Sequence, residues 1–161
     1  MKKLILMRHG KSSWEFDLPD DNRPLKSRGI NDARLVSEIF KEKNINFDVV
    51  LSSPANRAFS TCKIFLKNFN FNFENIQVVP DLYDFHGENV IKTIKNVDDR
   101  YHNIMIFGHN HAFTSICNIF GDKFIENLPT SGLAVIEFEI DSWRDLKKGT
   151  TTLTIFPSDY K

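Results

Sequence analysis

The segment LILMRHG, residues 4–10, decides the expected fold. Its four apolar residues are bounded by polar ones, which is the pattern of a short, fully buried strand. A cation, an imidazole and a glycine follow at the end of that strand. Because ligands of open α/β sheets bind beyond the carboxyl ends of the strands, Arg8 and His9 stand where a site is expected.

Short apolar runs alternate with segments of helical periodicity along most of the chain. The runs that predict strands are 48–52, 76–79 and 103–107, followed by 133–140 and 151–156. Helical spacing of apolar residues covers 30–40, 58–66, 90–97 and 113–120. Ser27 and Ser53 are the expected N-caps of the first two helices, with Pro54 at the first helical position of the second. This order predicts the α/β class, a three-layer α/β/α domain over residues 1–161 with a mainly parallel central sheet and an antiparallel C-terminal edge.

Composition excludes several classes of protein. The 161 residues carry 21 Lys plus Arg and 21 Asp plus Glu, so the formal net charge is zero. Nucleic-acid binding needs a basic excess or a basic face, so we expect no nucleic-acid partner. The first apolar run is too short for a signal sequence, and no stretch approaches the ~20 apolar residues of a membrane span. We therefore expect a cytoplasmic monomer without a membrane partner.

Three expected strand ends bring polar side chains to one edge of the sheet. Arg8 and His9 follow the first strand, Arg57 lies just beyond the second, and His109 follows the strand at 103–107. The loop at 11–27 adds Arg23. Its alternative role is an ion pair with a neighbouring aspartate, Asp20 or Asp21. Adjacent arginines would repel a metal cation, so no metal is expected. Guanidinium groups match phosphate oxygens bidentately, and the set therefore predicts a phosphate site.

A histidine beside a bound phosphate can act as a nucleophile and form a phosphoenzyme. His9 must then be neutral, which neighbouring arginines favour by lowering its pKa. Its second ring nitrogen must be held, and a backbone carbonyl is the expected partner. His109 would give a hydrogen bond or a positive charge to the phosphoryl oxygens, and the arginines would offset the charge that builds there.

These residues resemble the motifs of the histidine phosphatase superfamily, also called phosphoglycerate-mutase-like. The resemblance lies in RHG at 8–10, SSPANRA at 52–58 with Thr61, and GHN at 108–110. Within the superfamily, KSSW at 11–14, RPL at 23–25 and RG at 28–29 are similar to the SixA branch of phosphohistidine phosphatases. Three motifs in the family's order, each at a strand end, make the resemblance specific, and it runs from Leu4 to about Phe138.

The resemblance implies a phosphoglycerate-mutase-like fold and a metal-independent phosphatase without a cofactor. It implies a covalent phosphohistidine at His9, with Arg8, Arg57 and His109 as catalytic residues. The expected phosphate-binding residues are Arg23, Asn110 and Gly10. The implied substrate is a protein that carries phosphohistidine, such as a signalling or phosphotransfer protein.

Many family members place a carboxylic acid in the loop after the third strand, to protonate the leaving group. That loop offers Asp84 and Glu88 as candidate general acids here, beside Asp81 and His86. The loop is too short for a cap, so we expect an open site that suits a phosphorylated side chain on a protein surface, since small ligands normally require an enclosing pocket. Two alternatives are a small-molecule phosphomonoesterase of the same superfamily, which would use such an acid, and a non-catalytic phosphate-binding module.

Overall fold

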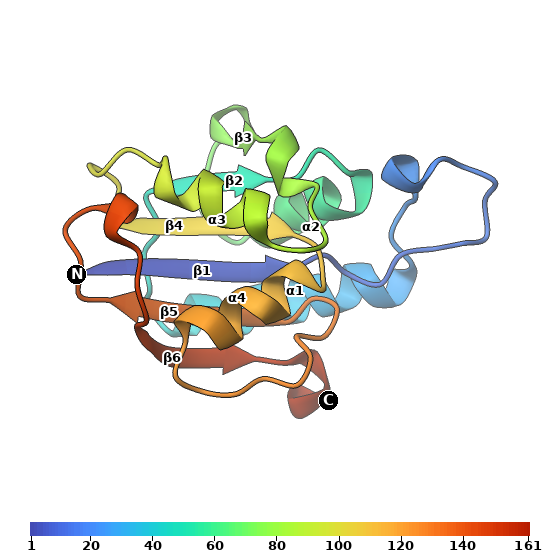
Figure 1. The fold of residues 1–161 in the computed structure, drawn as a ribbon. Helices are drawn as coiled ribbons and strands as arrows, with labels where there is room; N and C mark the ends of the chain where they lie inside the picture. The colour runs from blue at the N-terminus through green and yellow to red at the C-terminus, as the bar shows by residue number, and fades with distance from the viewer.

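The computed structural model describes residues 1–161 and contains one six-stranded sheet, of order β3-β2-β4-β1-β5-β6 (Figure 1). The strands are β1 (Lys2–Arg8), β2 (Val49–Ser52), β3 (Gln77–Val78), β4 (Asn103–Gly108), β5 (Leu133–Phe138) and β6 (Thr150–Ile155). Strands β1 to β4 are parallel, β5 is antiparallel to β1, and β6 is antiparallel to β5. The predicted mainly parallel sheet with an antiparallel C-terminal edge is confirmed.

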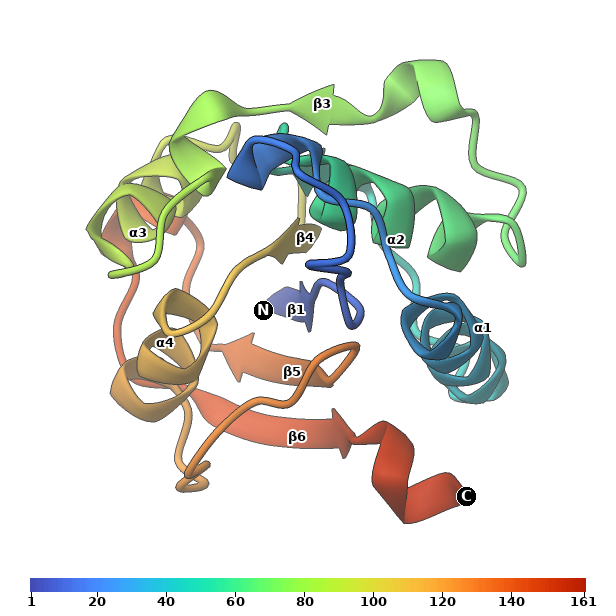
Figure 2. The same ribbon diagram turned by 90° about the vertical axis from the view of Figure 1, so that its right-hand side faces the viewer.

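Helices cover both faces of the sheet, as the view along it shows (Figure 2). One face carries α1 (Ser27–Glu42) and α2 (Asn56–Leu66), and the other carries α3 (Glu88–Lys95) and α4 (Ala112–Phe120). Successive residues of a strand point to opposite faces. Leu4 and Leu6 therefore join the core that includes Val90 and Phe113, whereas Ile5 and Met7 join the core under α1 and α2. Burial on both faces explains why β1 is a continuous apolar run.

Three local predictions need correction. Helix α2 begins at Asn56 after the N-cap Ala55, because the Ser53 hydroxyl contacts the His109 ring instead of capping the helix. Helix α1 is preceded by Lys26 and has no side-chain cap, so Ser27 is its first residue. Strand β3 pairs with β2 at only two positions, so it is shorter than the predicted run at 76–79.

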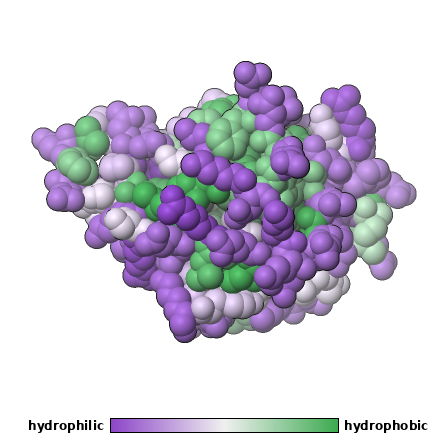
Figure 3. Space-filling view, turned by 180° about the vertical axis from the view of Figure 1, so that it is seen from behind, coloured by the Kyte–Doolittle hydropathy of each residue, from purple (hydrophilic) through white to green (hydrophobic).

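The loop between β1 and α1 forms one rim of the sheet's carboxyl edge. Its two ends are joined by hydrogen bonds from Ser13 N to Pro24 O and from Lys26 N to Lys11 O, both 2.8 Å. Its tip protrudes at the left of the space-filling view, where hydrophobic residues reach the surface (Figure 3); Trp14, Phe16 and Leu18 are exposed there.

Close backbone packing fixes the start of this loop against α1. A Cβ atom on Gly10 would lie 2.8 Å from the carbonyl oxygen of Gly29, so the contact requires glycine at position 10. The helix that follows the loop is thereby fixed beside the end of β1. None of the helices has the length and apolar character needed to cross a bilayer.

Candidate active site

The carboxyl ends of three adjacent strands, β2, β4 and β1, form the centre of the candidate site. Arg8 of β1 pairs with Gly108 of β4 in the parallel register, so the next residues, His9 and His109, become neighbours. Their ring centroids are 5.3 Å apart. A pocket of about 300 Å³ opens here, lined by Arg8, His9, Lys11, Ser12, Trp14, Asp20, Arg23, Arg57, Phe85, Asn110 and Thr130.

His9 is held through its main chain and its ring. Its N–H donates to Gly108 O and its carbonyl accepts from Ser131 N, both at 3.0 Å. The ring Nδ1 lies 2.7 Å from the carbonyl oxygen of Gly10. A carbonyl only accepts, so Nδ1 carries the proton and Nε2 keeps its lone pair. The predicted backbone carbonyl partner of His9 is confirmed.

The His9 imidazole is neutral at physiological pH. Burial is the largest cause that lowers its pKa; the hydrogen bond to Gly10 opposes it and the charges of Arg57, Arg8 and Arg23 add to it, so that the pKa falls from 6.5 to about 3. A neutral ring with a free Nε2 is the state that a nucleophile requires.

Arg8, Arg23 and Arg57 line the pocket, and each has a buried N–H group without a hydrogen-bond partner in the protein. Arg8 Nη1 donates to Leu128 O at 2.9 Å, while Arg57 and Arg23 bind Asp20. Six buried side-chain polar atoms have no partner within the protein, and four of them are Arg8 Nε, Arg23 Nη1, Arg57 Nε and His109 Nδ1. Buried polar atoms are otherwise almost always hydrogen-bonded. The concentration of unpaired polar atoms near His9, three of which are guanidinium N–H donors, fits an anion with several acceptor oxygens.

His109 is fully buried. Its Nε2 lies 2.8 Å from Ser53 Oγ, and the rings of Tyr83 and Phe85 each pack 5.1 Å from its own ring. Burial, followed by repulsion from His9 in its protonated form and from Arg57, lowers its pKa to about 3. Of the two predicted roles, the neutral hydrogen-bond donor therefore fits better than the cation.

Asp20 is a site residue that sequence reasoning treated only as an ion-pair partner of Arg23. Its carboxylate accepts from Arg23 Nε at 3.1 Å, from Arg57 Nη2 at 3.0 Å and from the Tyr83 hydroxyl, and its main-chain carbonyl accepts from Arg57 Nη1 at 2.7 Å. Partial burial raises its pKa, but the hydrogen bonds from Tyr83 and Arg57 outweigh this and lower the pKa to about 2. Asp20 is thus a permanent anion that aligns two guanidinium groups.

Two of the predicted phosphate ligands have other partners. The Gly10 N–H donates to Thr61 Oγ1 at 2.9 Å, and Thr61 Oγ1 in turn donates to Arg57 O at 2.7 Å. Gly10 therefore links the end of β1 to α2, and its amide is not free for phosphate. Asn110 lines the pocket, with its amide oxygen bound to Thr114 and its amide nitrogen donating to Asn127.

The predicted general acids lie outside the pocket. The Asp84 carboxylate accepts four backbone N–H groups, those of His86, Gly87, Asn89 and Val90, at 3.0 to 3.2 Å. It therefore caps the start of α3, and its oxygens are occupied by main-chain groups outside the pocket. Glu88, the first residue of α3, is exposed and lines a different hollow with Lys92 and Lys95. Asp20 is the only carboxylate among the lining residues.

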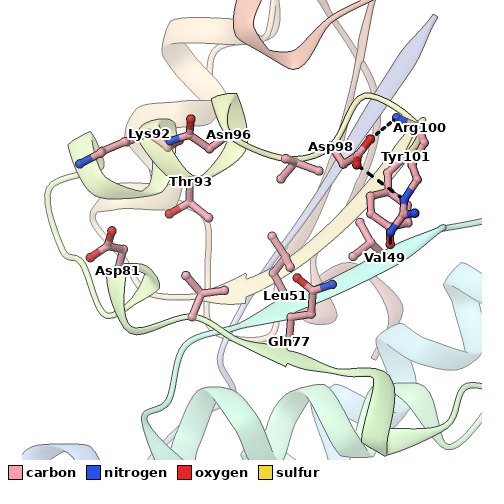
Figure 4. Close-up of a pocket in the computed structure, with 12 residues that line it drawn as sticks. Val49, Leu51, Gln77, Asp81, Lys92, Thr93, Asn96, Asp98, Arg100 and Tyr101 are labelled. Carbon is pink, nitrogen blue, oxygen red and sulfur yellow. Dashed lines mark hydrogen bonds and ion pairs between the residues drawn. The ribbon is translucent and has the colours of Figure 1, made fainter.

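A separate hollow of about 450 Å³ lies between α3 and the β2–β3 side of the sheet (Figure 4). Its floor is apolar, with Val49, Leu51, Val79 and Val97, and its rim carries an ion pair between Asp98 and Arg100. It contains no histidine or cysteine. We therefore place the chemistry in the smaller pocket, where the histidines and arginines meet. No group of three or more His, Cys, Asp or Glu side chains in the structure is arranged to hold a metal ion.

The fold and this site define an α/β protein with a histidine-centred anion pocket at the carboxyl edge of its sheet. A family model described as the histidine phosphatase superfamily, branch 1, matches residues 4–90. That match covers more than half of the sequence, including the motifs around His9 and Arg57. The chain belongs to the histidine phosphatase superfamily.

Similar proteins match this chain over most of its length. The structure of the protein histidine phosphatase SixA complexed with tungstate superposes with a TM-score of 0.83 over 99% of both chains, at 20% sequence identity. The uncharacterized protein Rv1276c of Mycobacterium tuberculosis is 28% identical over 160 residues, which covers 93% of this chain and 98% of its own. The uncharacterized chloroplastic protein At3g52155 of Arabidopsis thaliana is 28% identical over 155 residues, covering 89% of this chain and 70% of its own.

Proposed function

We propose that this protein is a phosphohistidine phosphatase of the SixA type. It removes the phosphoryl group from a protein phosphohistidine through a covalent intermediate on His9. The observation that carries the proposal is the neutral His9 ring with its free Nε2, beside unpaired N–H donors of Arg8, Arg23 and Arg57 and the unpartnered Nδ1 of His109. The SixA structure with the same fold was solved in complex with tungstate, a tetrahedral oxyanion like phosphate, which supports oxyanion binding by a protein of this fold.

The reaction has two phosphoryl transfers. In the first, His9 Nε2 attacks phosphorus, the P–N bond of the substrate breaks, and the departing imidazole takes a proton from water; the hydroxide ion left behind is neutralised by a proton of the phosphate released in the second. In the second, water attacks phosphorus, the P–N bond to His9 breaks, and inorganic phosphate leaves with the protons of the water molecule. His9 returns to its neutral state with Nδ1–H on the Gly10 carbonyl.

The protein contributes positioning and charge in both steps. Negative charge spreads over the three equatorial oxygens during phosphoryl transfer, and donors fixed in advance stabilise it. The guanidinium groups are fixed before the substrate arrives, because Asp20 binds Arg23 and Arg57 and the Leu128 carbonyl binds Arg8.

The pocket favours phosphohistidine over a phosphate ester. The only carboxylate that lines the pocket, Asp20, is an anion tied to two arginines and so cannot supply a proton. A positioned general acid is typically worth ~10²- to 10⁴-fold, and an ester substrate would lack that help. The P–N bond is labile and needs it less. The short segment 79–87 between β3 and α3 also leaves the pocket open, which suits a side chain presented by another protein.

The test is a turnover assay on a phosphohistidine peptide, an aryl phosphate and a sugar phosphate, run side by side. We expect the phosphohistidine peptide to be preferred and His9→Ala to be inactive, with a phosphoryl group trapped on His9 after rapid quenching without acid. Preference for a sugar phosphate would replace the proposal with a small-molecule phosphomonoesterase. Binding of the peptide without turnover or trapped phosphoryl group would make the chain a binding module.

A further inference from the structure

The Ser53 hydroxyl makes a buried contact with His109 that the proposed reaction does not yet use. Ser53 follows directly after β2 and is fully buried. Its N–H donates to Phe107 O at 3.0 Å, which fixes it beside the end of β4. Its Oγ lies 2.8 Å from His109 Nε2.

Counting the protons on this pair gives the direction of the hydrogen bond. Ser53 Oγ already accepts from Ala55 N at 3.2 Å. A hydroxyl has a single proton to give, and the only acceptor bonded to this hydroxyl is His109 Nε2. The hydroxyl therefore donates to Nε2, which must carry a lone pair.

This direction decides where His109 carries its own proton. A neutral imidazole has one N–H, so a lone pair on Nε2 leaves the proton on Nδ1. Burial lowers the pKa of His109 well below neutrality, which keeps the ring uncharged. Nδ1 is buried and has no acceptor within the protein. An oxygen of a phosphoryl group beside His9, whose ring is 5.3 Å away, is the acceptor that would satisfy it.

We infer that Ser53 is a positioning residue that holds His109 in its Nδ1–H form, so that the neutral ring donates a hydrogen bond to the phosphoryl group. The other tautomer would direct a lone pair at the phosphoryl oxygens and leave the Ser53 hydroxyl proton without an acceptor. This inference rests on the proposed function for its phosphoryl group, but the state of the ring can be measured without turnover.

The experiment is nuclear magnetic resonance of the full chain with ¹⁵N-labelled histidine, in the presence of inorganic phosphate. His109→Gln identifies the His109 signals. In the wild type we expect Nδ1 at a pyrrole-like shift and Nε2 at a pyridine-like shift. Ser53→Ala should move the ring toward the Nε2–H form, and Ser53→Thr, which retains a hydroxyl, should restore the wild-type pattern. Ser52→Ala is the matched control, because Ser52 Oγ donates only to the Ser53 carbonyl.

Turnover is measured on the same samples. Deleting an oxyanion donor costs ~10²- to 10³-fold. Ser53→Ala leaves the His109 ring in place but removes the hydrogen bond that favours its Nδ1–H tautomer. We therefore expect kcat to fall about tenfold with KM little changed. An Nε2–H ring in wild-type protein with phosphate would overturn the inference, as would an unchanged tautomer in Ser53→Ala. An Nδ1–H ring in a wild type that hydrolyses nothing would support the tautomer and refute the phosphatase.

Discussion

Replacing Arg57 with lysine tests whether the site needs a guanidinium fork or only a positive charge. Arg57 is 2% exposed. Its Nη1 and Nη2 donate to the carbonyl and carboxylate of Asp20 at 2.7 and 3.0 Å, and its Nε has no partner within the protein. A lysine ammonium is a single point charge on a flexible stem. It cannot bind both oxygens of Asp20 and reach a phosphoryl group as well, so the bond that we propose from Arg57 to the phosphoryl group would be lost.

The size of the effect follows from that one bond. A hydrogen bond to a charged group contributes about 1.5 to 3 kcal/mol. Each 1.36 kcal/mol of transition-state stabilisation corresponds to a factor of ten in rate, so Arg57→Lys should lower kcat/KM about 10- to 150-fold. Stability should change less, because the ammonium still neutralises Asp20.

The assay is steady-state hydrolysis of a phosphohistidine peptide, with inhibition by inorganic phosphate measured beside it. Arg34→Lys is the matched control, because Arg34 is exposed on α1 and lies outside the pocket. We expect the control to match the wild type, and Arg57→Lys to lose phosphate affinity as well as rate. An Arg57→Lys enzyme as active as the control would refute the role given to the fork.

Two further predictions concern stability. Burial lowers the pKa of both His9 and His109 from 6.5 to about 3, so the folded chain binds fewer protons than the unfolded chain in that window. The free energy of unfolding should fall as pH falls below 6.5, with a slope approaching ~1.4 kcal/mol per pH unit for each histidine. Urea unfolding at about pH 7 and at about pH 5 measures this slope. A slope in His109→Gln equal to that of the wild type would contradict the prediction. Asp84→Asn should lower the free energy of unfolding by about 1 to 2 kcal/mol, because the carboxylate caps α3. Turnover should stay near that of the wild type, whereas the ~10²- to 10⁴-fold loss typical of a deleted general acid would restore Asp84 to that role.

The strands and the convergence of their ends could be predicted from the sequence, because both have local causes. β1 and β4 are buried on both faces and so appear as continuous apolar runs. Each is followed directly by its histidine. Parallel strands present their carboxyl ends at one edge, so the sequence predicts that His9 and His109 meet there. Arg57 lies at the same edge, because it is in the first turn of α2, just after β2.

The sequence-based predictions were wrong or incomplete where a side chain interacts with residues far away in the sequence instead of with its neighbours. Ser53-Pro54 has the pattern of a helix start, but the Ser53 hydroxyl binds His109, which is 56 positions away, and α2 starts later. Asp84 is a candidate acid from the sequence, because an aspartate in a loop looks the same there whether its carboxylate caps a helix or acts in catalysis. Asp20 has no local pattern that marks it, since its partner Arg57 lies 37 positions further along the chain.

The residues at the strand ends and the loops that form the rims of the pocket are separate parts of the chain, and this separation affects how such a domain can change during evolution. His9, His109 and Arg57 lie at or just beyond the central strands, where the hydrogen bonds of the sheet fix them. The rims come from the loop at 9–26 and the segment 79–87, which extend beyond the sheet. Insertions, deletions and substitutions at the exposed loop tip can change which molecule reaches His9 while the reactive centre stays intact. A lineage with this architecture can therefore acquire new substrates without rebuilding its chemistry.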